Sequence, residues 1–326
     1  MPELELNADL VLEGGGVKGI ALAGAYSVIE ERGYTIKRVA GTSAGSIVGA
    51  LIAAGFTAKQ LEDEMRKLDY LRFKDKSFFD KLPFLGKAMS VLFEDGIYEG
   101  EYAKNWVRDQ LASKGIGTFA DLPYENPELK PEQKYRLVVM VSDITSGSLC
   151  KLPWDYPEYK LEPGTQKVAD AVRASMSIPF FFEPVKLGRS VLVDGGMLSN
   201  FPVQVFDAPK EREPRWPTFG IKLSTRAKAL EGTIADVDGP IDMTIAMIKT
   251  MTSFYDRMYV DNPDVQARTI FVDTGTIRAT DFDLKPAQRD MLFKNGRDAA
   301  NKFFDGGDGQ KPWDWKAYKR EFRQPG

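Results

Sequence analysis

Apolar residues in the first part of the chain alternate between short continuous runs and runs with helical spacing. Residues 8–13 and 35–40 are short and rich in β-prone side chains, which is typical of buried strands. Between them, apolar side chains recur at the positions i, i+3, i+4 and i+7 of a helix, namely Leu22, Ala25, Tyr26 and Ile29. Gly33 follows where a helix C-cap is expected. This order of elements predicts a parallel sheet covered by helices.

Later apolar runs predict four further strands, at residues 135–141, 191–193, 219–223 and 269–272. We expect one α/β unit over residues 1–304, because α/β folds of this length often form a single domain. Residues 305–309 are rich in glycine and predict a flexible link. The tail that follows, to residue 326, carries aromatic side chains that would dock on this chain or on a partner: Trp313, Trp315, Tyr318 and Phe322.

Residues 41–45 read Gly-Thr-Ser-Ala-Gly and lead from the second predicted strand into a run of small and apolar residues. This pattern predicts a nucleophile elbow, a tight strand-to-helix turn that places the hydroxyl of Ser43 above the sheet. Gly41 leaves room for the turn, and Gly45 for the crossing of strand and helix. Taken alone, the pattern also fits a glycine-rich turn before a buried helix. Glycines and hydroxyl side chains interrupt the uncharged stretch 39–58, so we interpret it as a buried helix and not as a membrane span.

The chain contains no histidine, which excludes a Ser-His-Asp triad, so a catalytic serine would need another base. Its single cysteine, Cys150, leaves no visible cluster of metal ligands. We therefore expect neither a metal nor a cofactor.

A glycine-rich loop follows the first predicted strand and opens the first predicted helix. Its glycines at positions 14, 16 and 19 formally match the dinucleotide-binding fingerprint. That fingerprint expects an acidic residue at the end of the second strand, where this chain has Ala40. A phosphate-binding P-loop is excluded because Lys18 is followed by Gly19 and not by serine or threonine.

A third motif, Asp194-Gly195-Gly196, follows the predicted strand 191–193. With the glycine-rich loop and the serine turn, in this order along the chain, it resembles the patatin-like phospholipases. The segments 170–185 and 200–203 fit the same family, and the resemblance extends over about residues 8–304. It implies a three-layer α/β/α fold with a mainly parallel sheet, and a serine lipid acyl hydrolase with a Ser–Asp dyad.

The resemblance assigns a role to each motif. Ser43 would be the nucleophile that forms the acyl-enzyme, and Asp194 the general base for acylation and for the deacylating water. Backbone N–H groups of the loop would stabilise the oxyanion, from Gly14, Gly15 and Gly16. The other motif positions are Lys18, Gly19, Gly41, Gly45, Gly195 and Gly196.

Two residues near these motifs have other interpretations. Asp143 also ends an apolar strand, but it lacks the paired glycines, and we expect it to bond loop amides. Lys18 is unusual in a first helical turn, where a cation opposes the helix dipole. It could be a solvated side chain, contact an anionic substrate or brace the loop.

Charge and composition limit the partners. A net charge of −3 and a pI near 5.4 argue against a nucleic-acid binder. Residues 1–6 show no signal-peptide pattern, and we expect a cytoplasmic protein. A lipid substrate would bring it into peripheral contact with a membrane. The sequence predicts no oligomeric state.

Two apolar segments each have more than one interpretation. Residues 70–98 mix aromatic side chains with lysines, which fits either a lipid-facing excursion over the site or an ordinary cap. Residues 242–259 place methionines on one helical stripe, which fits an acyl-chain pocket, plain core or a dimer contact.

The alternative to a hydrolase is a non-catalytic lipid- or nucleotide-binding module that keeps the glycine-rich loop. The presence of Ser43, Asp194 and the loop together argues against it. If Asp194 is the base, we expect no acidic limb of activity near the histidine pKa of about 6.5, and a fall only toward ordinary carboxylate pKa values.

Overall fold

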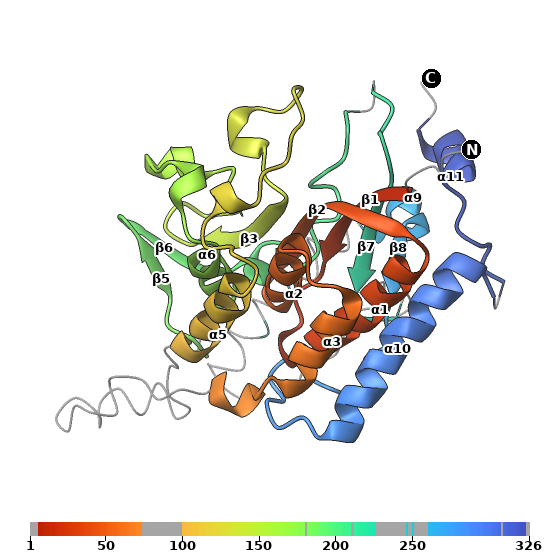
Figure 1. Ribbon diagram of the computed structural model, residues 1–326, viewed down its shortest axis with the longest axis horizontal. Coiled ribbons are helices and arrows are strands. Elements are labelled where there is room, and N and C mark those ends of the chain that lie inside the picture. The colour runs from red at the N-terminus through yellow and green to blue at the C-terminus, as the bar shows by residue number, and fades with distance from the viewer. Residues whose placement is uncertain are drawn as a thin grey trace.

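The computed structural model describes residues 6–73, 100–179, 181–209, 212–225, 246, 250, 260–307 and 309–323. These residues form a central sheet with helices packed against it (Figure 1), and the α/β architecture predicted from the sequence is confirmed. Residues 74–99, which hold most of the predicted cap, lie outside the described residues. So do all but two residues of the predicted methionine helix at 242–259.

Eight strands make up the sheet in the described part of the chain: β1 (Leu6–Leu12), β2 (Tyr34–Thr42), β3 (Leu137–Asp143), β4 (Ser148–Leu152), β5 (Val185–Leu187), β6 (Ser190–Asp194), β7 (Thr218–Lys222) and β8 (Thr269–Phe271). The strand order is β5-β6-β3-β2-β1-β7-β8, and β4 also pairs with β3. Strands β1, β2, β3, β7 and β8 are parallel, whereas β4 and β6 run antiparallel to β3. All six predicted strands are present, and the two that were not predicted, β4 and β5, are short and contain lysines.

One face of the sheet carries most of the described helices: α1 (Gly19–Glu31), α2 (Ala44–Ala53), α3 (Ala58–Lys67), α5 (Glu101–Ala112), α6 (Val168–Ser175) and α10 (Pro286–Asp305). The other face is covered by α9 (Pro263–Ala267) and by the segment around Phe201. Every residue of α2 is buried, in agreement with the buried helix predicted after the serine turn. None of the helices in the described ranges is both long and apolar enough to cross a bilayer.

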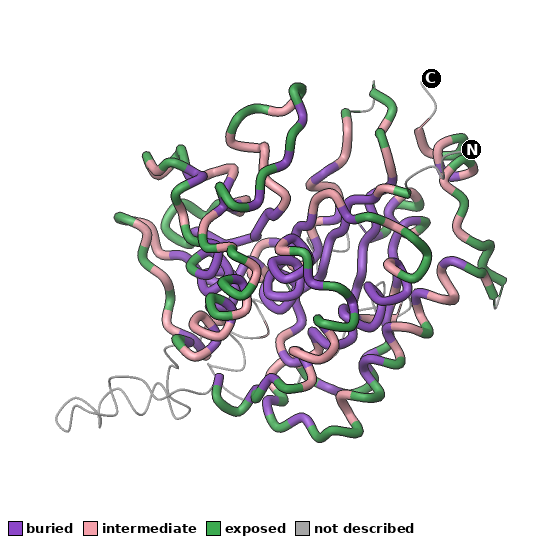
Figure 2. The backbone as a smooth tube through the Cα atoms, viewed as in Figure 1, coloured by how far each residue is buried: buried purple, intermediate pink, exposed green. Residues whose placement is uncertain are grey.

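The central strands are buried on both faces (Figure 2). Successive strand residues point to opposite sides of a sheet. Leu10 and Leu12 accordingly belong to the larger core cluster, beneath the six helices, and Val11 to the smaller one. Continuous apolar runs such as those of β1 and β3 are what a parallel sheet between two layers requires.

The aromatic tail packs on its own chain. Trp313 stacks on Phe303 with 5.3 Å between ring centroids, and its backbone N–H donates to the Phe303 carbonyl at 3.1 Å. The same indole meets Phe219 of β7 edge-on at 5.2 Å. In the helix that follows, α11 (Trp315–Phe322), Tyr318 is buried. The sequence left open whether the tail docks on this chain or on a partner, and in the structure it packs on this chain.

Candidate active site

The predicted strand-to-helix turn joins β2 to α2, with Ser43 at its apex. Ser43 has φ 51° and ψ −124°, a backbone conformation that non-glycine residues rarely adopt. A Cβ atom at position 41 would collide with the Gly45 carbonyl oxygen, and one at position 45 with the Leu12 carbonyl oxygen. Both glycines are thus required by close backbone approach, as the sequence pattern predicted.

The sheet brings Ser43 and Asp194 together from two strands that flank β3. Thr42 of β2 lies opposite Met140 on one side of β3, and Asp194 of β6 lies opposite Val141 on the other side. Because β6 runs antiparallel to β3, its last residue returns toward Ser43 and away from Asp143, at the end of β3. The Ser43 side chain faces the Asp194 carboxyl closely enough to act on its pKa, which it lowers.

The Asp194 carboxyl is buried and accepts a backbone hydrogen bond. The residue is only 5% exposed, and its Oδ1 accepts the N–H of Gly196 at 2.7 Å. Burial raises the pKa of Asp194 to about 6, although the hydrogen bonds from Ser43 and Gly196 act in the opposite direction. The expected fall in activity toward acid pH, placed by the sequence at ordinary carboxylate pKa values, therefore moves up toward pH 6, because the carboxyl group is buried and not solvated.

Ser175, at the end of α6, holds the backbone of the serine turn. Its Oγ accepts the N–H of Ser43 at 2.9 Å and donates to the Met140 carbonyl at 2.6 Å. Two residues further on, the Ser177 carbonyl accepts the backbone N–H of Asp194 at 2.9 Å. The C-terminal end of α6 and the residues that follow it thus contact both Ser43 and Asp194. Sequence analysis assigned no role to either serine, although both lie in the segment 170–185 that fits the family.

The glycine-rich loop lies directly beside the serine. A Cβ atom at position 14 would be 3.2 Å from the Cβ of Ser43. The backbone N–H of Gly14 is already bonded, because it donates to the Asn200 carbonyl at 3.1 Å. The Gly14 carbonyl accepts from Asn200 Nδ2 at 3.0 Å. Within the described chain the N–H groups of Gly15 and Gly16 have no acceptor. Gly16 has φ 54°, and a Cβ there would collide with the Ala279 carbonyl oxygen.

A buried ion pair fixes the base of this loop. Lys222 Nζ contacts the carboxylate of Glu13, which also accepts the backbone N–H of Leu223. Both ionic side chains are less than a tenth exposed, so the charge of each compensates the buried charge of the other. Lys18 Nζ lies 3.5 Å from the Leu223 carbonyl, which places this lysine against the end of β7.

Asp143 has the structural role that the sequence analysis predicted. Its Oδ1 accepts the backbone N–H groups of Thr145 and Ser146 at 2.9 and 3.3 Å, and its Oδ2 accepts the Tyr159 hydroxyl at 3.0 Å. Burial acts to raise the pKa of Asp143, but its hydrogen bonds together lower it below the ordinary value. The two strand-end aspartates are therefore shifted in opposite directions.

Comparison with known proteins places the chain in a family. Residues 10–207 match the patatin-like phospholipases. The uncharacterized protein YqhO of Bacillus subtilis (strain 168) is 38% identical over 294 residues, which make up 89% of this chain and 95% of YqhO. The probable lipid hydrolase 463L of Invertebrate iridescent virus 6 is 28% identical over 60% of this chain and 62% of its own length.

The fold has a similar solved structure in VipD from Legionella pneumophila, with a TM-score of 0.53 and 22% identity over 92% of this chain. The match spans 66% of VipD. The family match covers more than half of the present chain and includes the loop, the serine turn and the Asp-Gly-Gly motif. The chain therefore belongs to the patatin-like phospholipase family and is a lipid hydrolase.

Proposed function

We propose that this lipid hydrolase cleaves carboxylic esters of membrane lipids through an acyl-enzyme on Ser43, with Asp194 as the general base. The observation that carries the proposal is that the sheet places the Ser43 side chain beside the buried Asp194 carboxyl, whose pKa the serine lowers. The chain has no histidine that could act instead. A membrane-lipid substrate requires the enzyme to contact a lipid surface.

In the acylation step, Ser43 Oγ attacks the ester carbonyl carbon while its proton passes to the Asp194 carboxylate. The carbonyl oxygen becomes an oxyanion, and its donors would be the N–H groups of Gly15 and Gly16, which have no acceptor in the described chain and follow Gly14, the loop residue next to Ser43. When the tetrahedral intermediate collapses, the ester C–O bond breaks and the alcohol leaves with the proton from Asp194. The acyl group remains on Ser43 Oγ.

In the deacylation step, a water molecule attacks the acyl carbon and gives its proton to Asp194. A second oxyanion forms at the same donors, and its collapse releases the carboxylic acid. The proton on Asp194 then returns to Ser43 Oγ, which restores the starting state. A pKa of about 6 supports this role, because such a carboxylate is ionised at neutral pH and is a stronger base than an ordinary aspartate.

The proposal is tested by labelling the purified protein with a fluorophosphonate, followed by intact mass measurement and peptide mapping. The expected result is one adduct, on Ser43, that is lost in the Asp194→Asn variant. Asp143→Asn is the matched control, since it changes another buried strand-end aspartate that does not contact the serine, and it should retain the adduct. Release of fatty acid from phospholipid vesicles should follow the same pattern.

Labelling that persists in Asp194→Asn would refute the dyad, and labelling at another serine would refute Ser43 as the nucleophile. A folded protein that binds lipid vesicles without any adduct or fatty-acid release would favour the lipid-binding alternative.

A further inference from the structure

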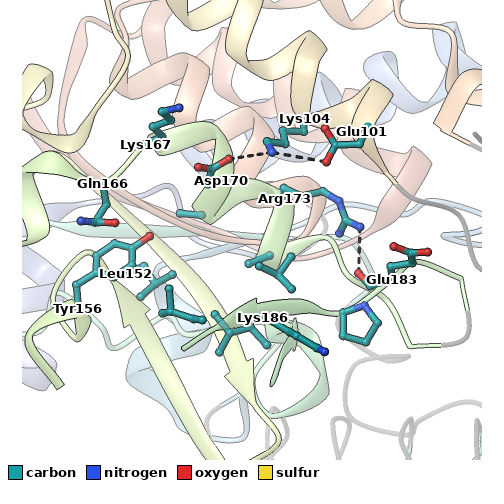
Figure 3. Close-up of a pocket in the computed structure, with 16 residues that line it drawn as sticks. Glu101, Lys104, Leu152, Tyr156, Gln166, Lys167, Asp170, Arg173, Glu183 and Lys186 are labelled. Carbon is teal, nitrogen blue, oxygen red and sulfur yellow. Dashed lines mark hydrogen bonds and ion pairs between the residues drawn. The ribbon is translucent and has the colours of Figure 1, made fainter. Parts of the chain in front are cut away.

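Arg173, in the last turn of α6, is a buried cation whose contacts lead to the proposed dyad. The residue is only 5% exposed. It lines a cavity of about 420 Å³ between α5, α6 and the β5–β6 hairpin, and neither Ser43 nor Asp194 lines that cavity (Figure 3). Burial of a guanidinium group is costly unless its N–H groups have acceptors, so the acceptors show what this side chain holds in place.

The first acceptor is the hydroxyl of Ser177, a residue with no exposed surface. Arg173 Nη1 donates to Ser177 Oγ at 2.6 Å, and the same hydroxyl donates to the Arg173 carbonyl at 3.1 Å. The carbonyl of Ser177 accepts the backbone N–H of Asp194 at 2.9 Å. Hydrogen bonds from a charged donor are stronger than neutral ones. The guanidinium therefore fixes the residue that holds the backbone of Asp194.

The second acceptor is the backbone carbonyl of Glu183, which Arg173 Nη2 reaches at 3.0 Å (Figure 3). Glu183 lies two residues before Val185, the first residue of β5. Strand β5 pairs with β6, where Val185 lies opposite Leu192, and β6 ends at Asp194. The same guanidinium thus holds two chain segments that both adjoin Asp194. A planar guanidinium group can hold two acceptors in a fixed geometry, whereas a lysine ammonium is a single point charge.

Helix α5 limits the space around this side chain. A Cβ atom at position 100 would be 2.6 Å from Arg173 Nε and 2.8 Å from its Cζ, so the backbone of Gly100, just before α5, packs directly on the guanidinium. The side chain is therefore enclosed by α5 on one side and held by its two acceptors on the other.

We propose that Arg173 is a positioning residue for the dyad. Its guanidinium holds Ser177 and the start of β5, and through them it keeps Asp194 where its carboxyl faces Ser43. The inference rests on the proposed function, because a residue that positions Asp194 affects the reaction only if Asp194 is the base.

The test measures the rate of fluorophosphonate labelling of Ser43, together with kcat and KM for p-nitrophenyl butyrate. Arg173→Lys should lower the labelling rate and kcat by about tenfold or more, because the ammonium cannot hold both acceptors. KM should stay within about twofold of the wild-type value, since a displaced base slows proton transfer without weakening substrate binding. Ser177→Ala, which keeps the carbonyl and removes only the hydroxyl, should lower both rates by about threefold or more.

The double variant tests the path through Ser177. Arg173→Lys combined with Ser177→Ala should be no slower than Arg173→Lys alone, because both changes break the same contact. Arg38→Lys is the matched control: this largely buried arginine pairs with Asp9 and lies in β2, five residues before Ser43. It should lose stability in denaturant titrations and keep the wild-type labelling rate.

Wild-type labelling and kcat in a folded Arg173→Lys protein would overturn the positioning role. So would a rise in KM at unchanged kcat, which would indicate a contact with substrate, or an equal loss of rate in Arg38→Lys, which would indicate general destabilisation. Losses that multiply in the double variant would overturn the path through Ser177. Failure of the dyad has a different signature, because labelling would then persist in Asp194→Asn, and this inference would fall with it.

Discussion

Replacement of Asp194 by asparagine should abolish hydrolysis and at the same time stabilise the folded protein at neutral and alkaline pH. Burial holds the Asp194 pKa at about 6, against 3.8 for an ordinary aspartate. The folded state therefore binds the proton more tightly than the unfolded state does. Above the folded-state pKa both states are ionised, and the folded protein carries the full cost of a buried charge. Asparagine removes that charge and keeps an acceptor for the Gly196 N–H.

The size of the stabilisation by Asp194→Asn follows from the shift of the Asp194 pKa. The difference between 3.8 and about 6 is roughly two pKa units, which corresponds to about 3 kcal/mol of unfolding free energy above pH 7. The gain should fall to roughly half of that near pH 5 and vanish below about pH 3, where aspartate is protonated in both states. Its sign is thus opposite to that of a carboxylate stabilised by an ion pair.

Urea unfolding of the wild type and Asp194→Asn at pH 8 and pH 5 measures the gain directly. Asp143→Asn is the matched control, since the pKa of Asp143 is lowered and its ionised form stabilises the fold. That variant should be less stable than the wild type at pH 8. If Asp194→Asn were destabilised at pH 8, or if its gain were the same at pH 8 and pH 5, the carboxyl would not be a desolvated ionised group.

Three further predictions concern the same site. The kcat/KM of the wild type should lose activity toward acid with a midpoint near pH 6, in a chain without histidine, and a midpoint near pH 4 would contradict the raised pKa. Ser175→Ala should lower kcat by about tenfold or more with little change in KM, because it removes the acceptor of the Ser43 N–H, and an unchanged kcat would show that the turn holds without it. Lys222→Met should lower the unfolding free energy by about 3–5 kcal/mol in denaturant titrations, because it leaves the buried Glu13 carboxyl without its ion-pair partner. Adding Glu13→Gln to that variant should recover part of the loss, and no recovery would count against this explanation.

The order of strands and helices could be read from local patterns. Continuous apolar runs identified six strands, and helical spacing identified the helix before Gly33. The short strands β4 and β5 were not predicted, because their lysines interrupt the apolar pattern. Their stability comes from pairing with β3 and β6. Local propensity does not contain such pairings.

The sequence by itself determined which residues could carry the chemistry. The absence of histidine, the serine between two glycines and the aspartate before two glycines are composition and spacing, and these properties do not depend on folding. Close backbone approach at Gly41 and Gly45 could likewise be inferred from the need for a tight turn.

Only the tertiary structure decided how those residues meet and what their environment does to them. The antiparallel direction of β6 turns Asp194 toward Ser43, and burial raises the pKa of that carboxyl to about 6. The Asn200 carbonyl accepts the N–H of Gly14, whereas the N–H groups of Gly15 and Gly16 have no acceptor in the described chain. The Ser175 hydroxyl accepts the N–H of Ser43 and so stabilises the serine turn. Each of these depends on contacts between residues far apart in the chain, and on the exclusion of water that those contacts produce. Neither property is encoded in any local stretch of sequence.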